Sequence, residues 1–396
     1  MQDNEKKPAL RFKGFTDPWE QRKVREVTDR YDNLRIPVAA SLRVAGTTPY
    51  YGANGIQDYV EGYTHDGEFI LVAEDGANDL KNYPVKCVKG RIWVNNHAHV
   101  LQGKCACADN QFLAYAISQA DIESLLVGGG RAKLNAETLM DIELLLPSKN
   151  EQIQIGHYLA RLDHLITLHQ RKYEKLVNIK KSMLDKMFPP NGASVPEIRF
   201  KGFTDPWEQR KLGELSCSFE YGLNAAAKEY DGQNKYLRIT DIDDTSRQFV
   251  TTDITSPDIN LTDADSYKLS DGDVLFARTG ASVGKTYLYK KFDGLVYFAG
   301  FLIRAKIKES VNAGFIFQNT LTRGYERYIA ITSQRSGQPG VNAQEYAEYQ
   351  LMLPELFEQE KIAKLLEALD TLITLHQRKL EKLQNIKKSC LEKMFA

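Results

Sequence analysis

Two long segments of this chain are nearly identical, and this repeat limits the possible folds more than any other feature. Residues Leu162–Phe188 return as Leu369–Phe395, with five of the 27 positions changed. A shorter repeat, RFKGFTDPWEQRK, opens each half at Arg11–Lys23 and again at Arg199–Lys211, with all 13 positions identical. The chain is therefore one structural unit written twice, and its two halves are expected to share one architecture.

The long repeat has the apolar spacing of a coiled-coil helix. Apolar residues recur at alternating steps of three and four for about four heptads, which places them on one seam of the helix. The predicted interface residues are Leu159, Leu162, Ile166, Tyr173, Leu176 and Met183 in the first copy, and Leu366, Leu369, Ile373, Leu380, Leu383 and Cys390 in the second. Two seam positions are polar in both copies, His169/His376 and Lys180/Lys387. These side chains either fix the register of the helices or merely extend to the edge of the seam.

The composition describes a globular protein of more than one domain. The chain has 396 residues, of which 42% are hydrophobic, and this length exceeds that of an ordinary single domain. Lys+Arg and Asp+Glu are equal at 52 each, so the net charge is zero. Zero charge argues against tight unaided binding of nucleic acid, but not against local basic patches or a partner that supplies positive charge. Five cysteines, a start without a signal-peptide pattern and no run of 18 apolar residues predict a protein of the reducing cytoplasm that does not span a membrane.

Two regions that differ in sequence lie between the repeats. Both contain a similar run, Asp66–Ala73 and Asp271–Ala277, soon followed by Gly-Ala, and strands are expected there over Glu68–Glu74 and Asp273–Arg278. We therefore expect two α/β (α+β) domains of one fold with different surfaces. Further strands are expected over Arg91–Leu101 and Leu295–Ile307. The predicted boundaries are 1–23 for an N-terminal segment with the first short repeat, 24–147 for the first domain, 148–190 for the first long helix, 191–211 for a linker with the second short repeat, 212–354 for the second domain and 355–396 for the second long helix.

The junctions between domain and helix complete a recognisable pattern. They are Leu144–Pro147 (LLLP) followed by Glu151-Gln152, and Leu351–Pro354 (LMLP) followed by Glu358-Gln359. Together with RFKGFTDPWEQRK, this order resembles the specificity subunit of type I restriction–modification systems over essentially the whole chain. The resemblance implies two target recognition domains separated by the long helices, which pack as an antiparallel coiled coil with an internal pseudo-two-fold. It also implies a subunit with no catalytic site and no cofactor, which binds double-stranded DNA and recruits two methyltransferase subunits and then restriction subunits.

The length of the helical repeat matches the scale of a DNA duplex. From Glu151 to Phe188 the helix would be roughly 57 Å long at 1.5 Å per residue, which exceeds one helical turn of DNA, about 34 Å. Two equal units related by an approximate two-fold axis would meet the duplex in equivalent poses. Since the two domains differ in sequence, we expect an asymmetric, bipartite target whose half-site centres lie about 10–10.5 bp apart.

Candidate DNA contacts are basic, amide, aromatic and hydroxyl residues in the variable regions, because polar side chains of these kinds read base edges and hold phosphates. In the first domain they are Tyr50, Tyr51, Asn54, Lys86, Lys89, Arg91, Arg131 and Lys133. In the second domain they are Arg238, Arg278, Thr279, Ser282, Lys285, Arg335, Ser336 and Gln338. Any one of them alone is more readily explained as a solvated surface residue, so the prediction rests on each set as a DNA-facing surface.

Two short motifs point to other chemistry and fall short of it. Gly280–Thr286 (GASVGKT) resembles a phosphate-binding loop but has three residues between its glycines where the motif needs four. His97-Ala98-His99 with Cys105-Ala106-Cys107 could supply four zinc ligands, but the usual cysteine spacing is absent and the second domain has no counterpart. We therefore predict neither a metal site nor nucleotide hydrolysis, and interpret the segments as a DNA-facing loop and as strand residues.

Two other functions stay open on the sequence alone. The chain could be a structural scaffold whose coiled coil binds other proteins and whose domains bind no DNA, an alternative that zero net charge slightly favours. It could also be an ATP- or metal-dependent enzyme, which only the two incomplete motifs support. Sequence-dependent affinity for DNA, measured with partner subunits present, separates the scaffold from a specificity subunit.

Overall fold

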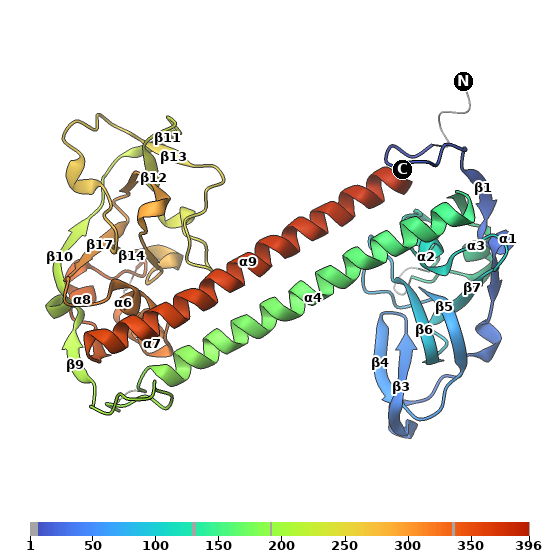
Figure 1. Cartoon of the computed structure of the whole chain (residues 1–396), viewed down its shortest axis with the longest axis horizontal. Coiled ribbons are helices and arrows are strands. Elements are labelled where there is room, and N and C mark those ends of the chain that lie inside the picture. Colours follow the sequence, from blue (N-terminus) through green and yellow to red (C-terminus); the bar gives the residue numbers. More distant parts are fainter. Residues whose placement is uncertain (1–6, 129–131, 191, 335–336, 396) are drawn as a thin grey trace. The chain divides into compact units, whose positions relative to one another are not determined.

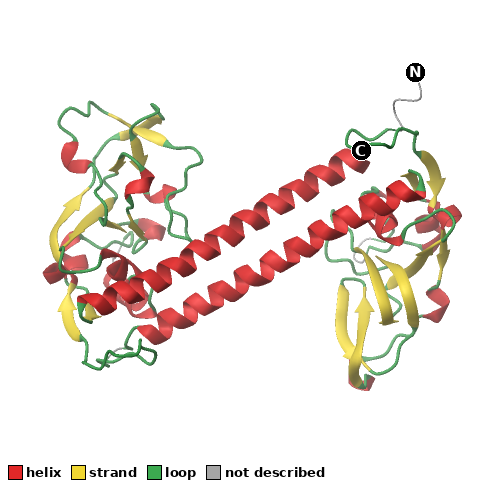
Figure 2. Cartoon of the chain, viewed as in Figure 1, coloured by secondary structure: helices red, strands yellow, loops and turns green. Residues whose placement is uncertain are grey.

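The computed structural model describes residues 7–128, 132–190, 192–334 and 337–395 of the chain. Two compact units divide it, residues 1–169 with 379–396 and residues 170–378. Each unit holds one mixed α/β domain and part of each of two long helices, α4 (Lys149–Met187) and α9 (Leu356–Phe395) (Figures 1 and 2). The predicted fold class, with two long helices and two mixed domains, is confirmed.

The long helices pack antiparallel in each unit. In the first unit, Leu159 near the start of α4 shares a core with Cys390 and Met394 at the end of α9. In the second unit, Met187 at the end of α4 shares a core with Leu366 near the start of α9. The start of each helix therefore meets the end of the other, as an antiparallel coiled coil requires. All twelve of the predicted interface residues are buried or half-buried.

The first domain is built on a six-stranded sheet in the order β2-β7-β5-β6-β3-β4. Its central strand β5 pairs antiparallel with β6 and β7, whereas β3 and β6 run parallel. Both faces of β5 are buried: Ile70 and Val72 face the core shared with the long helices, and Phe69 and Leu71 face a second core. The elements of this domain are α1 (Val24–Val27), β2 (Thr28–Arg30), β3 (Ala45–Gly52), β4 (Gly55–Val60), β5 (His65–Ala73), β6 (Val85–Val94), β7 (Ala98–Gly103), α2 (Asn110–Ser118), α3 (Ala136–Asp141) and β8 (Glu143–Leu146).

The second domain has a four-stranded sheet in the order β10-β17-β14-β15 and small two-stranded sheets, β11-β13 and β12-β16. Strand β14 repeats the pattern of β5, because Val274 and Phe276 face the core shared with the long helices while Leu275 and Ala277 face a second core. The elements are α5 (Leu212–Leu215), β10 (Ser216–Tyr221), β11 (Ala226–Glu229), β12 (Lys235–Leu237), β13 (Thr255–Asp258), β14 (Val274–Ala277), β15 (Thr286–Leu288), β16 (Val296–Phe298), β17 (Leu302–Ile307), α6 (Ala313–Asn319), α7 (Arg323–Thr332), α8 (Ala343–Ala347) and β18 (Gln350–Leu353).

The short repeat seats each domain against its long helices in the same way. Its last residues form β1 (Glu20–Lys23), paired with β8, and β9 (Glu208–Lys211), paired with β18. Its tryptophans are buried: Trp19 packs against Phe112 at 5.9 Å between ring centroids, and Trp207 against Phe315 at 5.7 Å. The identical sequences therefore perform identical packing roles, which explains why the repeat includes residues outside the coiled coil.

Two expected strands are each broken in the structure. The run Arg91–Leu101 contains the end of β6, then residues 95–97, then β7. The run Leu295–Ile307 contains β16, then residues 299–301, then β17. The prediction of single strands was wrong, and both breaks fall at a loop beside the end of the central strand of each domain.

Candidate nucleic-acid interface

The central strand of each domain ends at a loop built by the same backbone hydrogen bonds. After β5, the Glu74 amide donates to the His97 carbonyl at 2.9 Å, and the Glu74 carbonyl accepts from Leu134 at 2.7 Å. The segment after β5, the segment before β7 and the segment around residue 134 therefore meet at the end of β5. We call the resulting surface in the first domain the first loop surface; it comprises residues 74–78, 95–97 and 133 together with Asn54.

The second domain repeats this arrangement after β14. The Arg278 amide donates to the Phe301 carbonyl at 3.0 Å, and the Arg278 carbonyl accepts from Val341 at 2.9 Å. Positions Glu74 and Arg278 are thus structural equivalents. The second loop surface comprises residues 278–280, 299–301 and 338–341 together with Tyr221.

The second loop surface brings together three of the residues predicted from sequence, Arg278, Thr279 and Gln338. The Arg278 guanidinium stacks on the Tyr221 ring, with 5.1 Å from its central carbon to the ring centroid. Phe301 beside them is 60% exposed. A stacked arginine, an amide and an exposed aromatic ring are groups that can read a base edge or stack on a base.

The first loop surface has different chemistry at the equivalent positions. His97 is hydrogen-bonded to Asp75, and Lys133 forms an ion pair with Glu74 at 2.9 Å. Burial raises the pKa of Glu74, but hydrogen bonds from Arg35 and Lys133 outweigh it, so the pKa of this carboxyl lies below its usual value. The surface therefore carries fixed acidic groups beside a histidine and a lysine.

Asn54 belongs to this first surface through its side chain. Its amide nitrogen donates to the Gly76 carbonyl at 2.9 Å, and its amide oxygen accepts from the Asn78 backbone at 2.9 Å. The side chain thus fixes the loop that follows β5 while remaining at the surface. Of the residues predicted for the first domain, Asn54 and Lys133 are the described ones that lie here.

Other predicted residues of the first domain lie apart from the loop surface. Lys86, Lys89 and Arg91 are exposed along β6, and Arg91 pairs with Asp66 at the opposite end of β5. Tyr50 and Tyr51 are buried, at 1% and 7% exposure. The Tyr50 hydroxyl accepts from the Val38 amide at 2.9 Å. These two tyrosines are therefore packing residues in this structure and are not accessible to a partner.

In the second domain, two predicted cations have partners within the protein. Lys285 is 7% exposed; its ammonium donates to the Ile242 carbonyl at 3.1 Å and pairs with Asp244. The Arg238 guanidinium donates to both carboxylate oxygens of Asp241, from Nε at 2.9 Å and from Nη2 at 2.7 Å. Ser282 lies in a short 3-10 helix, Gly280–Ser282. Arg131, Arg335 and Ser336 lie outside the described residues.

The two incomplete motifs do not form the sites they resemble. The lysine of the loop-like segment is buried against Ile242, and a Cβ added at Gly284 would lie 2.6 Å from Ile329, so no open phosphate cradle is present there. His99 uses both ring nitrogens, toward Asp32 at 2.8 Å and the Leu134 carbonyl at 2.9 Å. Within the described parts of the chain, no group of three or more His, Cys, Asp or Glu is placed to hold a metal ion.

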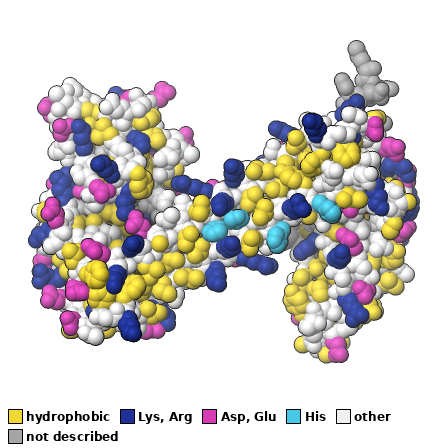
Figure 3. Space-filling model, in the orientation of Figure 1, with side chains coloured by type: hydrophobic (Ala, Val, Ile, Leu, Met, Phe, Trp, Pro, Cys, Tyr) yellow, Lys and Arg dark blue, Asp and Glu magenta, His cyan; other side chains and the backbone are white. Residues whose placement is uncertain are grey.

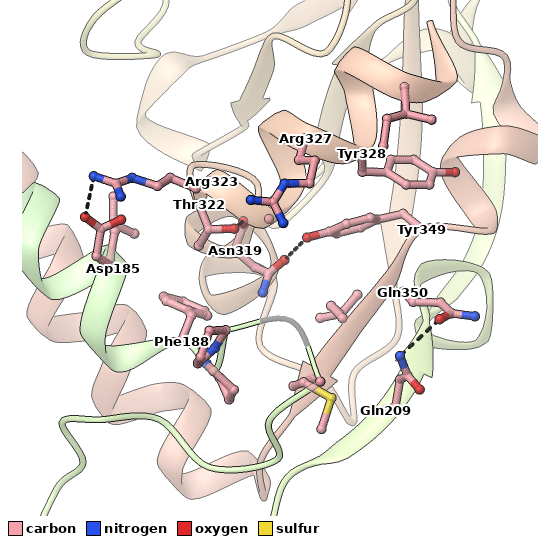
Figure 4. Close-up of a pocket in the computed structure, with 18 of the residues that line it drawn as sticks. Asp185, Phe188, Gln209, Asn319, Thr322, Arg323, Arg327, Tyr328, Tyr349 and Gln350 are labelled. Atoms are coloured by element: carbon pink, nitrogen blue, oxygen red, sulfur yellow. Dashed lines mark hydrogen bonds and ion pairs between the residues drawn. The ribbon is translucent and has the colours of Figure 1, made fainter.

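The second unit also contains a pocket of about 730 Å³ between the end of α4, the N-terminal part of α7 and β18 (Figure 4). Its polar side chains are largely paired with one another: Arg323 with Asp185 at 3.1 Å, Gln209 with Gln350 at 3.0 Å, and the Tyr349 hydroxyl with Asn319. None of the described residues that line it is His, Cys or Ser.

Sequence reasoning missed Tyr221 and Phe301. Both are aromatic residues at strand ends and read as ordinary apolar strand positions in the sequence. The available signal was Gly300, which precedes Phe301 and interrupts an apolar run where a turn becomes possible. The pairing of Tyr221 with Arg278 could not be found, because it depends on the β10-β17-β14 order.

The geometry defines a class of duplicated proteins in which two domains of one fold, each seated on a shared pair of long helices, present different surfaces. The sequence model for "Type I restriction modification DNA specificity domain" matches residues 16–178 and 204–385, which is most of the chain. The chain therefore belongs to the type I restriction–modification DNA specificity family, as the sequence predicted.

Individual relatives agree with this assignment. A type I restriction enzyme specificity subunit of Haemophilus influenzae is 42% identical over 173 residues, covering 39% of this chain and 45% of that protein. The match thus spans less than half the length of that relative. The MjaVIII specificity subunit of Methanocaldococcus jannaschii is 23% identical, covering 74% of this chain and 70% of the relative.

The fold of the whole chain also has a counterpart among solved structures. The S subunit of a type I restriction–modification system from M. genitalium superposes with a TM-score of 0.69 at 16% identity, covering 98% of this chain and 99% of that one. At this identity the likeness concerns the fold alone. No helix in the described part of the chain is long and apolar enough to cross a membrane.

Proposed function

We propose that this chain supplies the DNA sequence specificity of a type I restriction–modification complex. In this proposal each domain reads one half of an asymmetric, bipartite site, and the long helices set the length of the unread spacer. The chain performs no catalysis itself. Two methyltransferase subunits, and then restriction subunits, assemble on it and act on the DNA that it selects.

The observation that carries the proposal is the contrast between the two loop surfaces. They arise from the same backbone arrangement, yet Glu74 and His97 stand in the first where Arg278 and Phe301 stand in the second. Equivalent poses with different side chains are what a reader of two unlike half-sites requires. A purely structural scaffold would not need different chemistry at structurally equivalent positions.

The zero net charge fits a subunit that binds DNA as part of a complex. Phosphate contacts from Lys and Arg supply most of the affinity of nucleic-acid binders. In this chain Lys and Arg together do not outnumber Asp and Glu. Partner subunits would therefore provide much of the backbone affinity, while this chain provides the discrimination between sequences.

The long helices offer two equivalent places for partners. Leu165 and Leu168 of α4 are 40% and 38% exposed, and their repeat equivalents Leu372 and Leu375 of α9 are 42% and 44% exposed. On the face seen in Figure 3, apolar side chains lie among Lys and Arg along the helices. Exposed leucines at the same positions of both repeats support two copies of one partner, which agrees with two methyltransferase subunits.

We expect Leu168→Glu to remove one methyltransferase subunit from the complex, and Leu168→Glu with Leu375→Glu to remove both. Burial of a leucine side chain by a partner contributes about 1.5–3 kcal/mol to binding. Its replacement by a charged residue should therefore weaken the affinity for that partner by at least about tenfold. Native mass spectrometry of the purified complex gives the stoichiometry. Thr167→Glu, an exposed neighbour, is the matched control. Full stoichiometry in the double variant would place the partner contact elsewhere.

We expect Arg278→Ala to relax the sequence preference at one position of the half-site read by the second domain. Loss of an arginine–base contact costs about 1–3 kcal/mol of discrimination. Methylation of a library of randomised sites by the reconstituted complex measures the change position by position. Arg210→Ala, which removes an exposed arginine paired with Glu214, should leave the motif intact. An unchanged motif in the Arg278 variant would remove Arg278 from the proposed interface.

The proposed function as a whole is tested by exchanging residues 24–147 for the corresponding region of a relative and mapping the methylated motif. Only one half of the split motif should change, and the other half and the spacer should stay. A change in both halves would contradict the proposal that each domain recognises one half-site independently. No sequence-dependent DNA affinity, even with methyltransferase subunits present, would favour the scaffold instead.

A further inference from the structure

A polar cluster joins the first domain to both long helices in the first unit. One carboxylate oxygen of Asp163, on α4, pairs with the ammonium of Lys387, on α9, at 2.6 Å. The other oxygen accepts from the Tyr115 hydroxyl, on α2, at 2.6 Å. Burial, and then the bond to Asp163, raise the pKa of Tyr115, so this hydroxyl stays a donor. One carboxylate therefore holds two helices and the domain together.

The second unit contains the same cluster with one substitution. Asp370, on α9, pairs with Lys180, on α4, through one oxygen, and its other oxygen accepts from the Gln318 amide, on α6, at 2.8 Å. Asp163 and Asp370 occupy equivalent positions of the repeat, as do Lys180 and Lys387, and only the donor from the domain differs. Lys180 and Lys387 are the polar seam residues of the repeat, at 14% and 26% side-chain exposure.

A second duplicated contact ties each domain to one long helix only. Gln152 of α4 accepts from the Asp109 amide at 3.0 Å, at the start of α2. Gln359 of α9 accepts from the Asn312 amide at 2.9 Å, at the start of α6. Gln152 and Asp163 are 11 residues apart, about three helical turns, as are Gln359 and Asp370. Through this hydrogen bond the first domain is held to α4 and the second to α9, in addition to the apolar core that each domain shares with both helices.

The two lysine–aspartate pairs require the same helix register. From Asp163 to Lys180 is 17 residues forward along α4, and from Lys387 to Asp370 is 17 residues back along α9. A slip of one heptad would instead set Lys180 opposite Gln377 or Ala363, and Lys387 opposite Gln170 or Gly156. Either slip leaves both lysines on the seam without their carboxylates, whereas the heptad spacing of the apolar residues between the two domains would tolerate the slip.

We propose that the pairs Lys387–Asp163 and Lys180–Asp370 fix the register of the coiled coil and thereby the spacer between the two half-sites. The inference rests on the proposed function, in which each domain reads a half-site. If the first domain stays with Gln152 of α4 and the second with Gln359 of α9, a one-heptad slip moves the domains by about 10 Å, or about 3 bp of DNA. The pairs are positioning groups and need not touch DNA.

The test replaces both lysines by an apolar residue of similar length, Lys180→Met with Lys387→Met. The methionines keep the seam filled, but Asp163 and Asp370 lose their cations, so the melting temperature should fall, and the assays are run below it. The reconstituted complex should then methylate sites of more than one spacer length, with at least about a tenth of them shifted by about 3 bp, where the natural sequence uses one length. A single, unchanged spacer in the folded variant would overturn the inference.

The neighbouring lysines provide a matched control. Lys181 and Lys388 are exposed and are also repeat equivalents, so Lys181→Met with Lys388→Met changes charge and length equally but spares the seam. This control should keep the single spacer. The charge exchange Lys180→Asp with Asp370→Lys should also keep it, since Gln318 has a buried amide oxygen without a hydrogen-bond partner that can accept from the exchanged lysine.

A measurement without DNA separates failure of this inference from failure of the proposed function. Spin labels at Thr167→Cys and Lys382→Cys, exposed positions of the first unit, report the register as a distance once the native cysteines are replaced. A single label-to-label distance in the chain with its native lysines, and two distances in the Lys180→Met, Lys387→Met chain, support the register role even if no split motif is found. One distance in both chains contradicts it.

Discussion

Four residues inserted into each long helix, after Arg171 and after Arg378, should lengthen the unread spacer without changing either half-site. The two positions are repeat equivalents, so the insertions face each other in the antiparallel pair. Four residues add about 6 Å of helix, which corresponds to about 2 bp of duplex. Methylation of the original site should fall to background, and a motif with the longer spacer should replace it.

Two comparisons make the outcome decisive. Insertion into one helix alone should disrupt the pairing and abolish methylation at every spacer, because the seams of the two helices no longer match. Insertion into both keeps Asp163 with Lys387 and Asp370 with Lys180, since each pair lies wholly on one side of the insertions. An unchanged spacer in an active double insertion would contradict the idea that the helices set the distance.

Arg11→Ala should destabilise the first unit strongly and leave the second nearly unchanged. The Arg11 guanidinium binds both carboxylate oxygens of Glu151 at 2.6 and 2.8 Å, and Glu151 is completely buried. The hydrogen bond to Glu151 is also the main reason that the pKa of Arg11 is raised. Its removal leaves a buried carboxylate without its cation, which costs about 3–5 kcal/mol.

The repeat supplies the reciprocal experiment. Arg199 binds Glu358 in the same way, at 2.7 and 2.8 Å, so Arg199→Ala should destabilise the second unit instead. Calorimetry with hydrogen exchange assigns each unfolding transition to a unit. Arg22→Ala, which removes an exposed pair with Glu26, should have little effect. Equal destabilisation of both units by either variant would mean that the units do not unfold separately.

The parts of the fold that depend on local periodicity could be predicted from the sequence. The helical seam, the duplication and the shared scaffold of the two domains follow from spacing and repetition, and the strand expected at Asp273–Arg278 contains β14. The loop surfaces could not be predicted in the same way. The break at 299–301 lies inside an apolar run, and both this break and the one at 95–97 are set by the pairing of β7 and β17 with the central strands.

The candidate site residues show the same limit. Residue type suggested Lys285 and Tyr50, but both are buried, because a lysine or tyrosine can place its polar atom on a backbone carbonyl or amide inside the domain. Phe301 was overlooked because a phenylalanine in an apolar run is normally core. Whether such a residue points inward depends on which strands flank it, and the sequence does not state that directly.

The contacts that seat the domains have a consequence for how new variants of this chain arise. The helix side chains that receive a domain are the same in both halves: Gln152 and Asp163, or Gln359 and Asp370. Each glutamine accepts from a backbone amide, and only the donor to the aspartate differs, Tyr115 in the first domain and Gln318 in the second. A domain transferred from another gene by recombination within the repeated segments would therefore meet the same receiving side chains on the long helices. A single recombination event can thus change the recognised half-site without any compensating change in the long helices.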